Sequence, residues 1–333
     1  MSDYNTIRGL RVRYLSADPA GAEDGQVWYN SASGNLRVEG IQGAAAWSSG
    51  GNVNTARRGI FSVKNATQTT ALGAMGYTGS GTGVANAEAY DGSSWSNITA
   101  VPSSRYFGGG FGAQTTAVVM GGYSTVPSAG VKDITNEWDG SSWALGGVMP
   151  TPGGNFAADG CGTQTAGLAA GPTAPTFTTT IEYNGSSWTA VPGSMNGPPR
   201  SAGSSFGVQT AAIATAGNAP PGDVLDTESY DGTSWAVVGN NVYTGYGAAA
   251  GGTQAAGFFM RGGPASTAVG SSVWDNTSWT TSANNATGRS ESGGAGSQSA
   301  GIAFAGATTS PTNYSAATEE FNIPVGTATV SVS

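Results

Sequence analysis

A glutamine recurs six times along this chain, each time just before a short run of small and apolar residues. It stands at positions 68, 114, 164, 209, 254 and 298, a spacing of 46, 50, 45, 45 and 44 residues. A second phrase, Tyr90-Asp91-Gly92-Ser93-Ser94-Trp95, returns in step with it at 138–143, 183–188, 230–235 and 274–279. Two motifs that recur together every 44–50 residues indicate a repeat architecture.

Each repeat predicts four short strands. In the second repeat, residues 105–110 and 115–120 are joined at Gln114, and residues 135–138 lead through an Asp-Gly-Ser-Ser turn to Trp143. Turn residues bound every run, and four strands in this length are typical of a propeller blade. The 55 glycines argue against helices, and the regularly placed aromatic residues argue against disorder.

Several repeated residues resemble those of the Kelch repeat family over about residues 47–322. These are the pairs Gly121-Gly122 and Gly262-Gly263, the aromatic residue before the turn, and the Trp of the fourth strand. Repeats three and four carry Ala170-Gly171 and Ala216-Gly217 instead, as in a divergent member. The resemblance implies a Kelch-like β-propeller.

The repeat count predicts six blades. There are six glutamine turns but five complete Asp/Asn-Gly turns, with a degenerate sixth at Phe321-Asn322, so the last repeat has no Trp-bearing fourth strand. Trp47 lies 48 residues before Trp95 and has no blade of its own. We therefore predict an all-β, six-bladed Kelch-like β-propeller of four-stranded blades over residues 47–322, closed by the Trp47 strand, which hides two sheet edges.

The N-terminal region predicts a short β-hairpin. Residues 25–38, GQVWYNSASGNLRV, place two β-rich runs around an Asn-Ser-Ala-Ser-Gly connection. This phrase resembles an element of bacteriophage tail-fibre and other virion proteins, in particular those of phages of aquatic bacteria. We expect residues 1–46 to be an attachment segment and residues 323–333 a C-terminal tail or an extra strand.

Composition excludes several classes of function. Only 10% of residues are charged and the net charge is −8, which disfavours nucleic acid as a partner. No window approaches the ~20 apolar residues of a membrane span, so we expect no membrane insertion, and residues 1–15 lack a signal-peptide pattern.

The chain has no histidine, and Cys161 is its one cysteine, which excludes a Ser-His-Asp system, a structural zinc site and a disulfide. Galactose oxidase is a Kelch-type enzyme, but its copper site needs histidines. We expect no cofactor and no metal.

The repeated carboxylates are interpreted as structural. Asn184 stands where the other repeats carry Asp, and an amide cannot replace a general acid, whereas both cap a turn. The acids of this set are Asp91, Asp139, Asp231 and Asp275. A carboxylate-only glycosidase stays open, because glutamates lie beside the third-strand aromatic residue at positions 88, 137, 182, 228 and 320, but their repetition favours contacts between blades.

The turn phrase also resembles the Asp box of sialidases, with one residue fewer. Sialidases have six blades and bind a substrate carboxylate with arginines. Four arginines lie nine or ten residues before the repeated glutamine, and Asn155 and Gly245 take their place in the other two repeats. These arginines, Arg58, Arg105, Arg200 and Arg289, either line the channel and hold an anionic sugar or bond neighbouring blades.

The strand order places binding on one face. The glutamine turns and the Asp-Gly turns share a face and are uniform, whereas the loops between the second and third strands vary in length and sequence. Recognition is usually built on variable loops over a rigid scaffold. The predicted binding residues are those that break the repeat there, namely Tyr123, Lys132, Asp133, Asp223 and Arg261.

The resemblance to virion proteins implies a function. We predict a non-enzymatic bacteriophage virion protein, a tail or fibre-associated propeller serving in host-surface adhesion or particle assembly. It would assemble in the host cytoplasm, join other virion proteins through its N-terminal segment, form a homo-oligomer and contact a host-surface glycan. The alternatives are a glycan-binding or sialidase-like glycan-processing propeller, and a capsid decoration protein.

Overall fold

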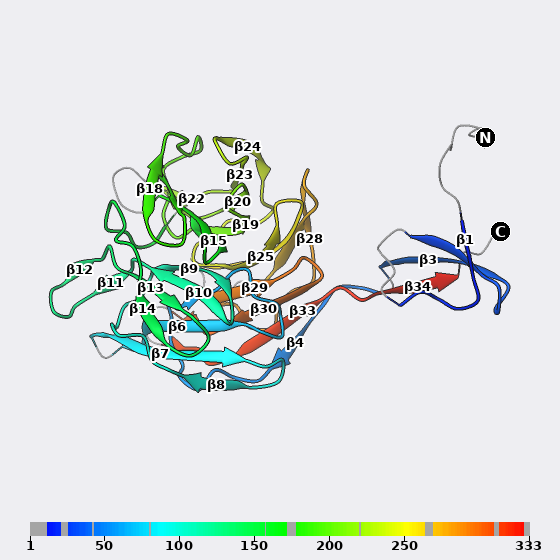
Figure 1. The fold of residues 1–333 in the computed structure, drawn as a ribbon, viewed down its shortest axis with the longest axis horizontal. Helices are drawn as coiled ribbons and strands as arrows, with labels where there is room; N and C mark the ends of the chain where they lie inside the picture. Colours follow the sequence, from blue (N-terminus) through cyan, green and yellow to red (C-terminus); the bar gives the residue numbers. More distant parts are fainter. Residues whose placement is uncertain are drawn as a thin grey trace. The chain divides into compact units, whose positions relative to one another are not determined.

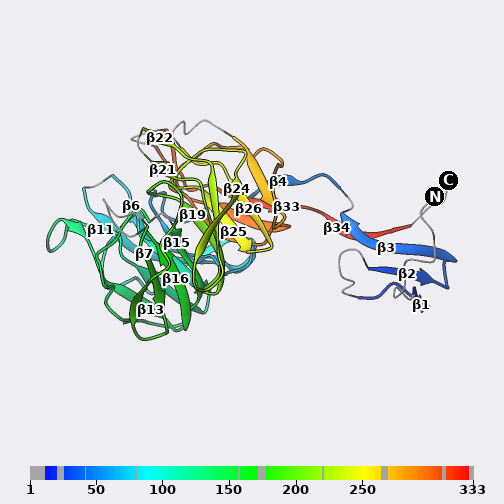
Figure 2. The ribbon, with the colours of Figure 1, turned by 90° about the horizontal axis from the view of Figure 1, so that it is seen from above.

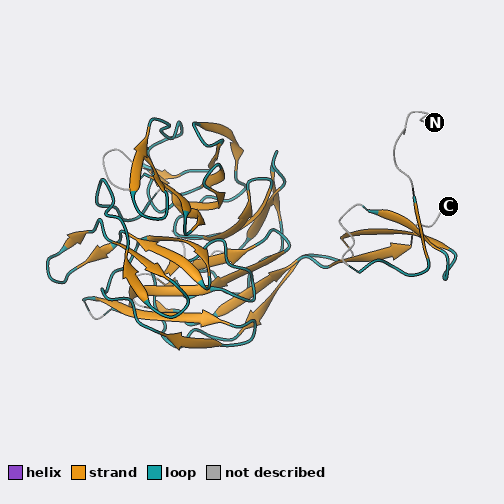
Figure 3. Ribbon diagram, in the orientation of Figure 1, coloured by secondary structure: helices purple, strands orange, loops and turns teal. Residues whose placement is uncertain are grey.

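The computed structural model describes residues 12–20, 26–41, 43–79, 81–156, 158–171, 178–219, 221–263, 269–309 and 313–329. These residues form strands, turns and loops (Figure 3). Within these ranges, no helix has the length and hydropathy required to cross a bilayer. The chain divides into two compact units, one of residues 46–322 and one that combines residues 1–45 with residues 323–333.

The larger unit contains six four-stranded antiparallel sheets, each a blade (Figure 1). In the first five blades the strands follow one another in chain order. The first blade holds β5 (Phe61–Ser62), β6 (Leu72–Tyr77), β7 (Gly83–Tyr90) and β8 (Trp95–Ile98). The second holds β9 (Gly109–Ala113), β10 (Thr116–Met120), β13 (Thr135–Trp138) and β14 (Trp143–Leu145). The third holds β15 (Ala158–Thr163), β16 (Ala166–Ala170), β17 (Thr180–Tyr183) and β18 (Trp188–Val191).

The remaining three blades repeat this plan. The fourth holds β19 (Ser204–Val208), β20 (Ala211–Thr215), β23 (Asp226–Tyr230) and β24 (Trp235–Asn240). The fifth holds β25 (Ala249–Thr253), β26 (Ala256–Met260), β27 (Ser271–Trp274) and β28 (Trp279–Thr281). The sixth holds β29 (Gly293–Gly296), β30 (Ala300–Phe304), β33 (Thr318–Asn322) and β4 (Ala46–Gly50).

The six blades form a closed ring. The first strands of consecutive blades lie side by side, from β5 through β9, β15, β19, β25 and β29 back to β5. The outer strand of the sixth blade comes from the start of the unit, because β4 pairs with β33 and sets Trp47 opposite Phe321. The all-β, six-bladed fold expected from the repeats is therefore confirmed.

Short hairpins lie in the connections between the second and third strands of alternate blades. They are β11 (Tyr123–Ser124) with β12 (Gly130–Val131), β21 (Asn218–Ala219) with β22 (Gly222–Asp223), and β31 (Ala307–Thr309) with β32 (Asn313–Tyr314). They belong to the second, fourth and sixth blades. Figure 1 labels both strands of the β11–β12 pair, and Figure 2 labels both strands of the β21–β22 pair.

Glycine is abundant because phenylalanine rings of one blade lie flat against the backbone of the next. A Cβ added at Gly167 would stand 2.2 Å from the Phe111 ring, and one added at Gly257 would stand 2.4 Å from the Phe206 ring. These rings are fully buried. The core thus consists of large rings against bare backbone, and a side chain at either glycine would push the blades apart.

The smaller unit is a sheet in the order β1-β2-β3-β34, formed by β1 (Arg13–Leu15), β2 (Val27–Asn30), β3 (Asn35–Ile41) and β34 (Val325–Thr329). The hairpin β2–β3 was expected from the sequence. The Asp18 carboxylate holds it, accepting hydrogen bonds from Trp28 Nε1 at 2.9 Å and Asn30 Nδ2 at 2.7 Å and pairing with Arg37 at 3.0 Å. The Asn30 bond is the largest of the causes that lower the pKa of Asp18 to about 2.

Residues Val325–Thr329 form the extra strand of this sheet, and residues 330–333 lie outside the described residues. β34 pairs antiparallel with β3, from Arg37 opposite Thr329 to Ile41 opposite Val325. Both ends of the chain therefore contribute to the smaller unit, and the larger unit begins and ends at its own closing strands.

Candidate functional site

The repeated glutamines tie each blade to the one before it. Gln114 Nε2 of the second blade donates to the carbonyls of Ala71 at 3.1 Å and Tyr90 at 2.6 Å in the first blade. Gln68 of the first blade reaches Gly301 and Phe321 of the sixth, both at 2.9 Å, so the ties close the ring. The amides are engaged in these bonds.

The repeated aspartates cap their turns. Asp91 Oδ1 accepts hydrogen bonds from the N–H groups of Ser93 at 2.8 Å and Ser94 at 2.7 Å, and Asn184 Oδ1 holds its turn in the same way. These bonds favour the ionised carboxylate and lower the pKa of Asp91, Asp231 and Asp275 to about 2, and that of Asp139 as well. The interpretation of these acids as turn caps is confirmed.

The Asp turns predict loss of stability in acid. A carboxyl whose pKa falls from 3.8 to about 2 on folding stabilises the fold at pH values above 3.8 and loses that contribution as the pH falls through 2. We expect the urea midpoint to fall between about pH 4 and pH 2. Asp231→Asn, which copies the Asn184 turn, should show a smaller fall than the parent chain. Equal falls in the two proteins would contradict this account.

The fourth-strand tryptophans also reach the preceding blade. Trp95, Trp188 and Trp235 donate from Nε1 to a threonine hydroxyl that stands three residues before the third-strand aromatic residue, at 2.8–2.9 Å. For Trp143 the residue three before the aromatic Tyr90 is Ala87, which has no hydroxyl. Trp143 Nε1 donates instead to the Thr99 carbonyl at 2.8 Å. Trp47 of β4 follows the rule and donates to Ser271 at 3.2 Å.

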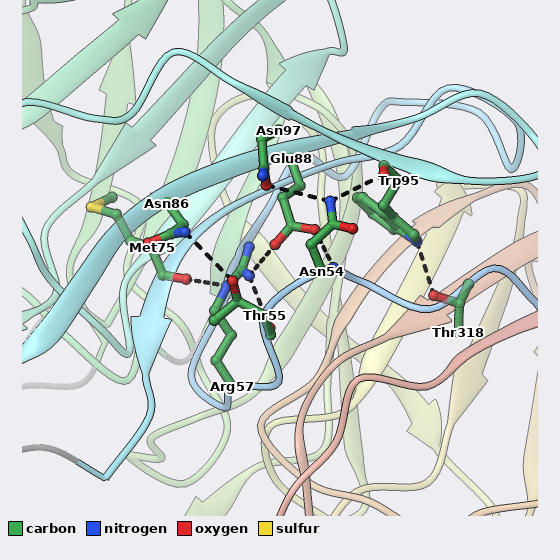
Figure 4. A network of polar contacts seen from close by, with 9 residues as sticks. All are labelled: Asn54, Thr55, Arg57, Met75, Asn86, Glu88, Trp95, Asn97 and Thr318. Atoms are coloured by element: carbon green, nitrogen blue, oxygen red, sulfur yellow. Dashed lines mark hydrogen bonds and ion pairs between the residues drawn. The ribbon is translucent and has the colours of Figure 1, made fainter.

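Buried arginines occupy the interior of four blades. Arg57 and Glu88 form an ion pair in which both side chains are fully buried (Figure 4). Arg57 Nε also donates to the Met75 carbonyl at 2.8 Å, and Glu88 accepts from the Asn54 N–H at 2.6 Å. Burial lowers the pKa of Arg57, and Glu88 opposes that shift.

The same site recurs where the sequence supplies both partners. Arg200 pairs with Glu228 at 3.1 Å, Arg289 pairs with Glu319 at 2.5 Å, and Arg105 bonds Asn136. The third and fifth blades have Gly153 and Gly245 in place of the arginine, opposite Ile181 and Ser272. Arginine and its partner are therefore present together or absent together.

This burial corrects the expected arginine lining of the channel. Arg105, Arg200 and Arg289 are fully buried inside their blades, where backbone carbonyls and carboxylates surround them. Arg57, and not Arg58, is the equivalent residue of the first blade. Arg58 is one-fifth exposed and pairs with Glu291 at 3.3 Å. Of the four arginines, Arg58 alone is partly exposed.

A second set of glutamates bonds the tyrosine of the following blade. Tyr230 donates to Glu182 at 2.9 Å, Tyr90 donates to Glu320 at 2.6 Å, and Tyr183 donates to Glu137. Burial, followed by the Glu320 bond, raises the pKa of Tyr90 to about 12. Where the third-strand residue is Trp138, Trp274 or Phe321, the preceding blade has Ala89, Ser229 or Val273. These glutamates thus bond blade to blade.

The pairing predicts a compensated double variant. Glu182→Val should lower the free energy of unfolding by about 1–3 kcal/mol, because it leaves the Tyr230 hydroxyl without its acceptor. Adding Tyr230→Phe should recover most of that loss, because Val273 and Phe321 already form such a pair between the fifth and sixth blades. Urea unfolding of the two single variants and the double variant measures the coupling. Additive losses would contradict it.

A ring of left-handed residues surrounds the axis on the variable-loop face. Each blade contributes one residue just before its first strand, with φ between 51° and 59°. The backbone N–H of each donates to the carbonyl of its counterpart in the preceding blade at 2.8–2.9 Å, and at the last step Ser292 N donates to Gly247 O at 3.1 Å. The six are Gly59, Phe107, Asn155, Ala202, Gly247 and Glu291.

The axis beneath this ring is filled. Lys64 of the first blade is buried and pairs with Asp159 of the third at 3.1 Å. Asn65 accepts from Gly162 N at 2.9 Å and donates to Gly207 O of the fourth blade at 2.8 Å. Since these blades are not all neighbours, the contacts cross the centre. We call this group the plug, and the channel is closed there.

Above the plug, the ring opens into a hollow that we call the channel mouth. Its cavity has a volume of about 270 Å³. A smaller space of about 50 Å³ lies below it, between the ring and Asp159. A further cavity of about 380 Å³ on the glutamine face is lined by Lys64, Asn65 and small polar residues. The channel mouth is lined by Phe107, Asn155, Ser201, Ala202, Asn218, Tyr246 and Glu291.

Two of the predicted binding residues flank the channel mouth. Tyr123 packs on Tyr106 with ring centroids 5.3 Å apart, and Tyr106 packs on Phe107 at 5.1 Å. Asp223 accepts a hydrogen bond from Asn218 at 2.8 Å. Both therefore contact residues at or next to the lining.

The other three predicted binding residues lie in their own connections. Lys132 Nζ donates to the Ser128 carbonyl at 2.6 Å. Asp133 accepts from Met149 N through its backbone carbonyl at 2.9 Å, and the Arg261 guanidinium lies 5.5 Å from the Tyr243 ring centroid. Lys132 and Asp133 are consecutive residues in the second blade, whereas Arg261 follows β26 in the fifth blade.

Comparison with known proteins agrees with this architecture. No protein-family model matches the chain, and no curated protein matches it. The solved structure of YjhT, a Kelch-repeat propeller protein, is similar, with a TM-score of 0.66 and 10% identity over 83% of this chain and 99% of YjhT. At this identity the likeness shows the fold alone. The chain is an all-β, six-bladed, Kelch-like β-propeller with a second β unit built from segments that precede and follow the propeller.

Proposed function

We propose that this chain is a non-enzymatic bacteriophage virion protein, a tail or fibre-associated propeller that presents the channel mouth to the host surface. The observation that carries the binding part is the left-handed ring. Its six positions share one backbone conformation and one pattern of hydrogen bonds, but their side chains range from glycine to phenylalanine and glutamate. A rigid scaffold with unlike side chains at one opening is the usual design of a recognition site.

The attachment part rests on the smaller unit. That unit has its own sheet, and its central hairpin carries the residues that resemble virion proteins. In this proposal it joins the propeller to other virion proteins and to further copies of the chain, after assembly in the host cytoplasm. The exposed Tyr14 ring, which packs on Tyr29 at 4.5 Å, is a suitable contact for such a partner.

The strain of the ring also supports a binding role. Phe107, Asn155, Ala202 and Glu291 hold left-handed backbones, which cost of order 1–2 kcal/mol each relative to the ordinary region. Such strain gathers at functional sites, where surrounding structure maintains it. The hydrogen bonds around the ring provide that support.

Labelled particles test the proposal. An antibody to the propeller, imaged on purified particles, should decorate the tail or its fibres. The recombinant chain should compete with particles for adsorption to host cells. Label spread evenly over the capsid would favour the decoration role instead, and absence of label from particles would end the virion assignment.

The glycan-processing alternative is separated by turnover. The glutamates and arginines that motivated it lie in contacts inside and between blades. A glycan that binds and is recovered intact after prolonged incubation supports the adhesive function. Released sugar that depends on Glu291 would replace it with catalysis.

A further inference from the structure

We propose that the channel mouth binds one uncharged pyranose residue of a host-surface glycan, an inference that rests on the adhesive function proposed above. The class of sugar follows from three properties of the described lining residues: an apolar wall, two polar groups that are not otherwise engaged, and a charge balance that opposes acids.

The apolar wall is the Phe107 ring. It is half-buried and its orientation is constrained on two sides, by the edge of Tyr106 at 5.1 Å between centroids and by the Arg58 guanidinium at 5.7 Å from its centroid. Arg58 also lies 5.5 Å from the Tyr77 ring. A pyranose has a face of C–H groups, and a rigid aromatic ring offers it contact area with little loss of side-chain freedom.

The polar groups are the Asn155 amide and the Tyr246 hydroxyl. Both line the cavity, the Asn155 side chain is exposed, and neither group makes a hydrogen bond to another described side chain or carbonyl. An amide offers two donors and two acceptor sites, and a phenol offers one donor and an acceptor. Together they match vicinal sugar hydroxyls, each of which both donates and accepts.

The charges at the opening exclude acidic sugars. Glu291 lines the cavity and uses Oε2 to pair with Arg58 at 3.3 Å, so this pair is balanced. The Lys64–Asp159 pair below it is balanced as well. Asp223, bonded to the lining residue Asn218, adds an uncompensated negative charge. An incoming carboxylate would meet net repulsion, because Arg58 is already paired with Glu291 and the other three candidate arginines are buried inside the blades.

The size of the cavity limits the ligand to one ring. About 270 Å³ is slightly below the range of roughly 300–1,000 Å³ that is usual for drug-sized ligands. The rest of a glycan would extend across the rim, where Tyr77 contacts Tyr106 at 5.0 Å and Tyr314 at 6.0 Å between ring centroids.

Titration of the full chain with simple sugars tests the inference. Saturation-transfer NMR with methyl glycosides of glucose, galactose, mannose and N-acetylglucosamine should detect binding of at least one. The methyl glycosides of glucuronic acid and N-acetylneuraminic acid should bind at least tenfold more weakly. Preference for an acid, or for the cationic methyl glucosaminide, would overturn the proposal, as would absence of binding by every neutral probe.

Variants place the binding at the channel mouth. Phe107→Ala and Asn155→Ala should each weaken the neutral sugar at least tenfold, and alanine is compatible with the ring because Ala202 already occupies it. Leu145→Ala, on the exposed edge of β14, is the matched control and should leave affinity unchanged. Glu291→Gln should raise affinity for the glucuronide, because it frees Arg58 and removes a negative charge. Unchanged sugar affinity in both alanine variants, with unfolding midpoints like the parent, would contradict the site.

Adsorption assays separate this inference from the function on which it rests. If the parent chain and the Phe107→Ala chain block particle adsorption equally, adhesion stands and the sugar site is wrong. If the parent binds the neutral glycoside with the expected variant pattern but does not block adsorption, the sugar site stands and the adhesive function is wrong.

Discussion

Removing residues 46–51 from the isolated propeller is expected to lower its free energy of unfolding by more than about 4 kcal/mol. The comparison is between a chain of residues 46–322 and a chain of residues 52–322. The shorter chain loses β4, the only partner of β33 on its outer side among the described strands. It also loses Trp47, whose ring lies 5.1 Å from Phe321 and 6.2 Å from Phe258.

The size of this effect follows from ordinary costs. Trp47 is half-buried, so its loss costs less than the about 3–5 kcal/mol of a fully buried aromatic side chain, but the pairing of five strand residues is lost with it. Domains are stable by only about 5–15 kcal/mol in total. Guanidinium unfolding of the two chains measures the difference. Coincident transitions would mean that the ring closes without β4.

Glu88→Ala should be the most damaging single substitution at a charged residue. It leaves Arg57 buried with no counter-ion, a change that typically costs about 3–5 kcal/mol. Glu88→Asn should cost less, because Asn136 serves Arg105 in the second blade. The loss should appear as a lower urea midpoint with an unchanged slope.

The third blade provides the control for this prediction. It has Gly153 and Ile181 where the first blade has Arg57 and Glu88. The double variant Arg57→Gly/Glu88→Ile should therefore be more stable than Glu88→Ala. If the double variant is the less stable of the two, packing rather than the buried charge governs the site.

The period of the sequence predicts the fold well because the same contacts recur in every blade. Each glutamine and each fourth-strand tryptophan serves one inter-blade contact, so counting them counts blades. The closing role of Trp47 also follows from the sequence. The Trp47 segment has no blade of its own and the sixth repeat lacks an outer strand, so the segment can complete that blade. The spacing does not predict whether each glutamine bonds the preceding or the following blade, because both neighbours of a blade have the same repeat.

Two of the six equivalent positions, Arg58 and Asn155, were assigned wrongly for a local reason. The first and third blades have two additional residues between the ring and the glutamine, which form part of the plug. Counting back from Gln68 and Gln164 therefore reached Arg58 and Asn155 instead of Arg57 and Gly153. The buried arginine occurs only in blades that carry Glu or Asn two residues before the third-strand aromatic residue. Searching the sequence for both residues together would have identified Arg57 rather than Arg58.

The channel mouth was only partly predictable. Variable loops indicated the right face, and two predicted residues, Tyr123 and Asp223, contact residues at or next to the lining. The ring itself shares a backbone conformation and no side chain, so residue patterns do not reveal it. The ring residues could have been located only by their position, since in the four blades with a buried arginine the ring residue follows that arginine by two positions. Asp18 was missed because it lies outside the hairpin phrase that it stabilises.

The pairing of β4 with β33 has a consequence for how the chain is made. Residues 46–50 leave the ribosome long before their partners, residues 318–322. An amphipathic strand therefore waits unpaired while five and a half blades form, which is a period of exposure to wrong partners. The sequence of this strand, Ala-Trp-Ser-Ser-Gly, has one large apolar residue among small polar ones. Such a composition keeps the waiting strand soluble, and translation speed over the last blade becomes a determinant of yield.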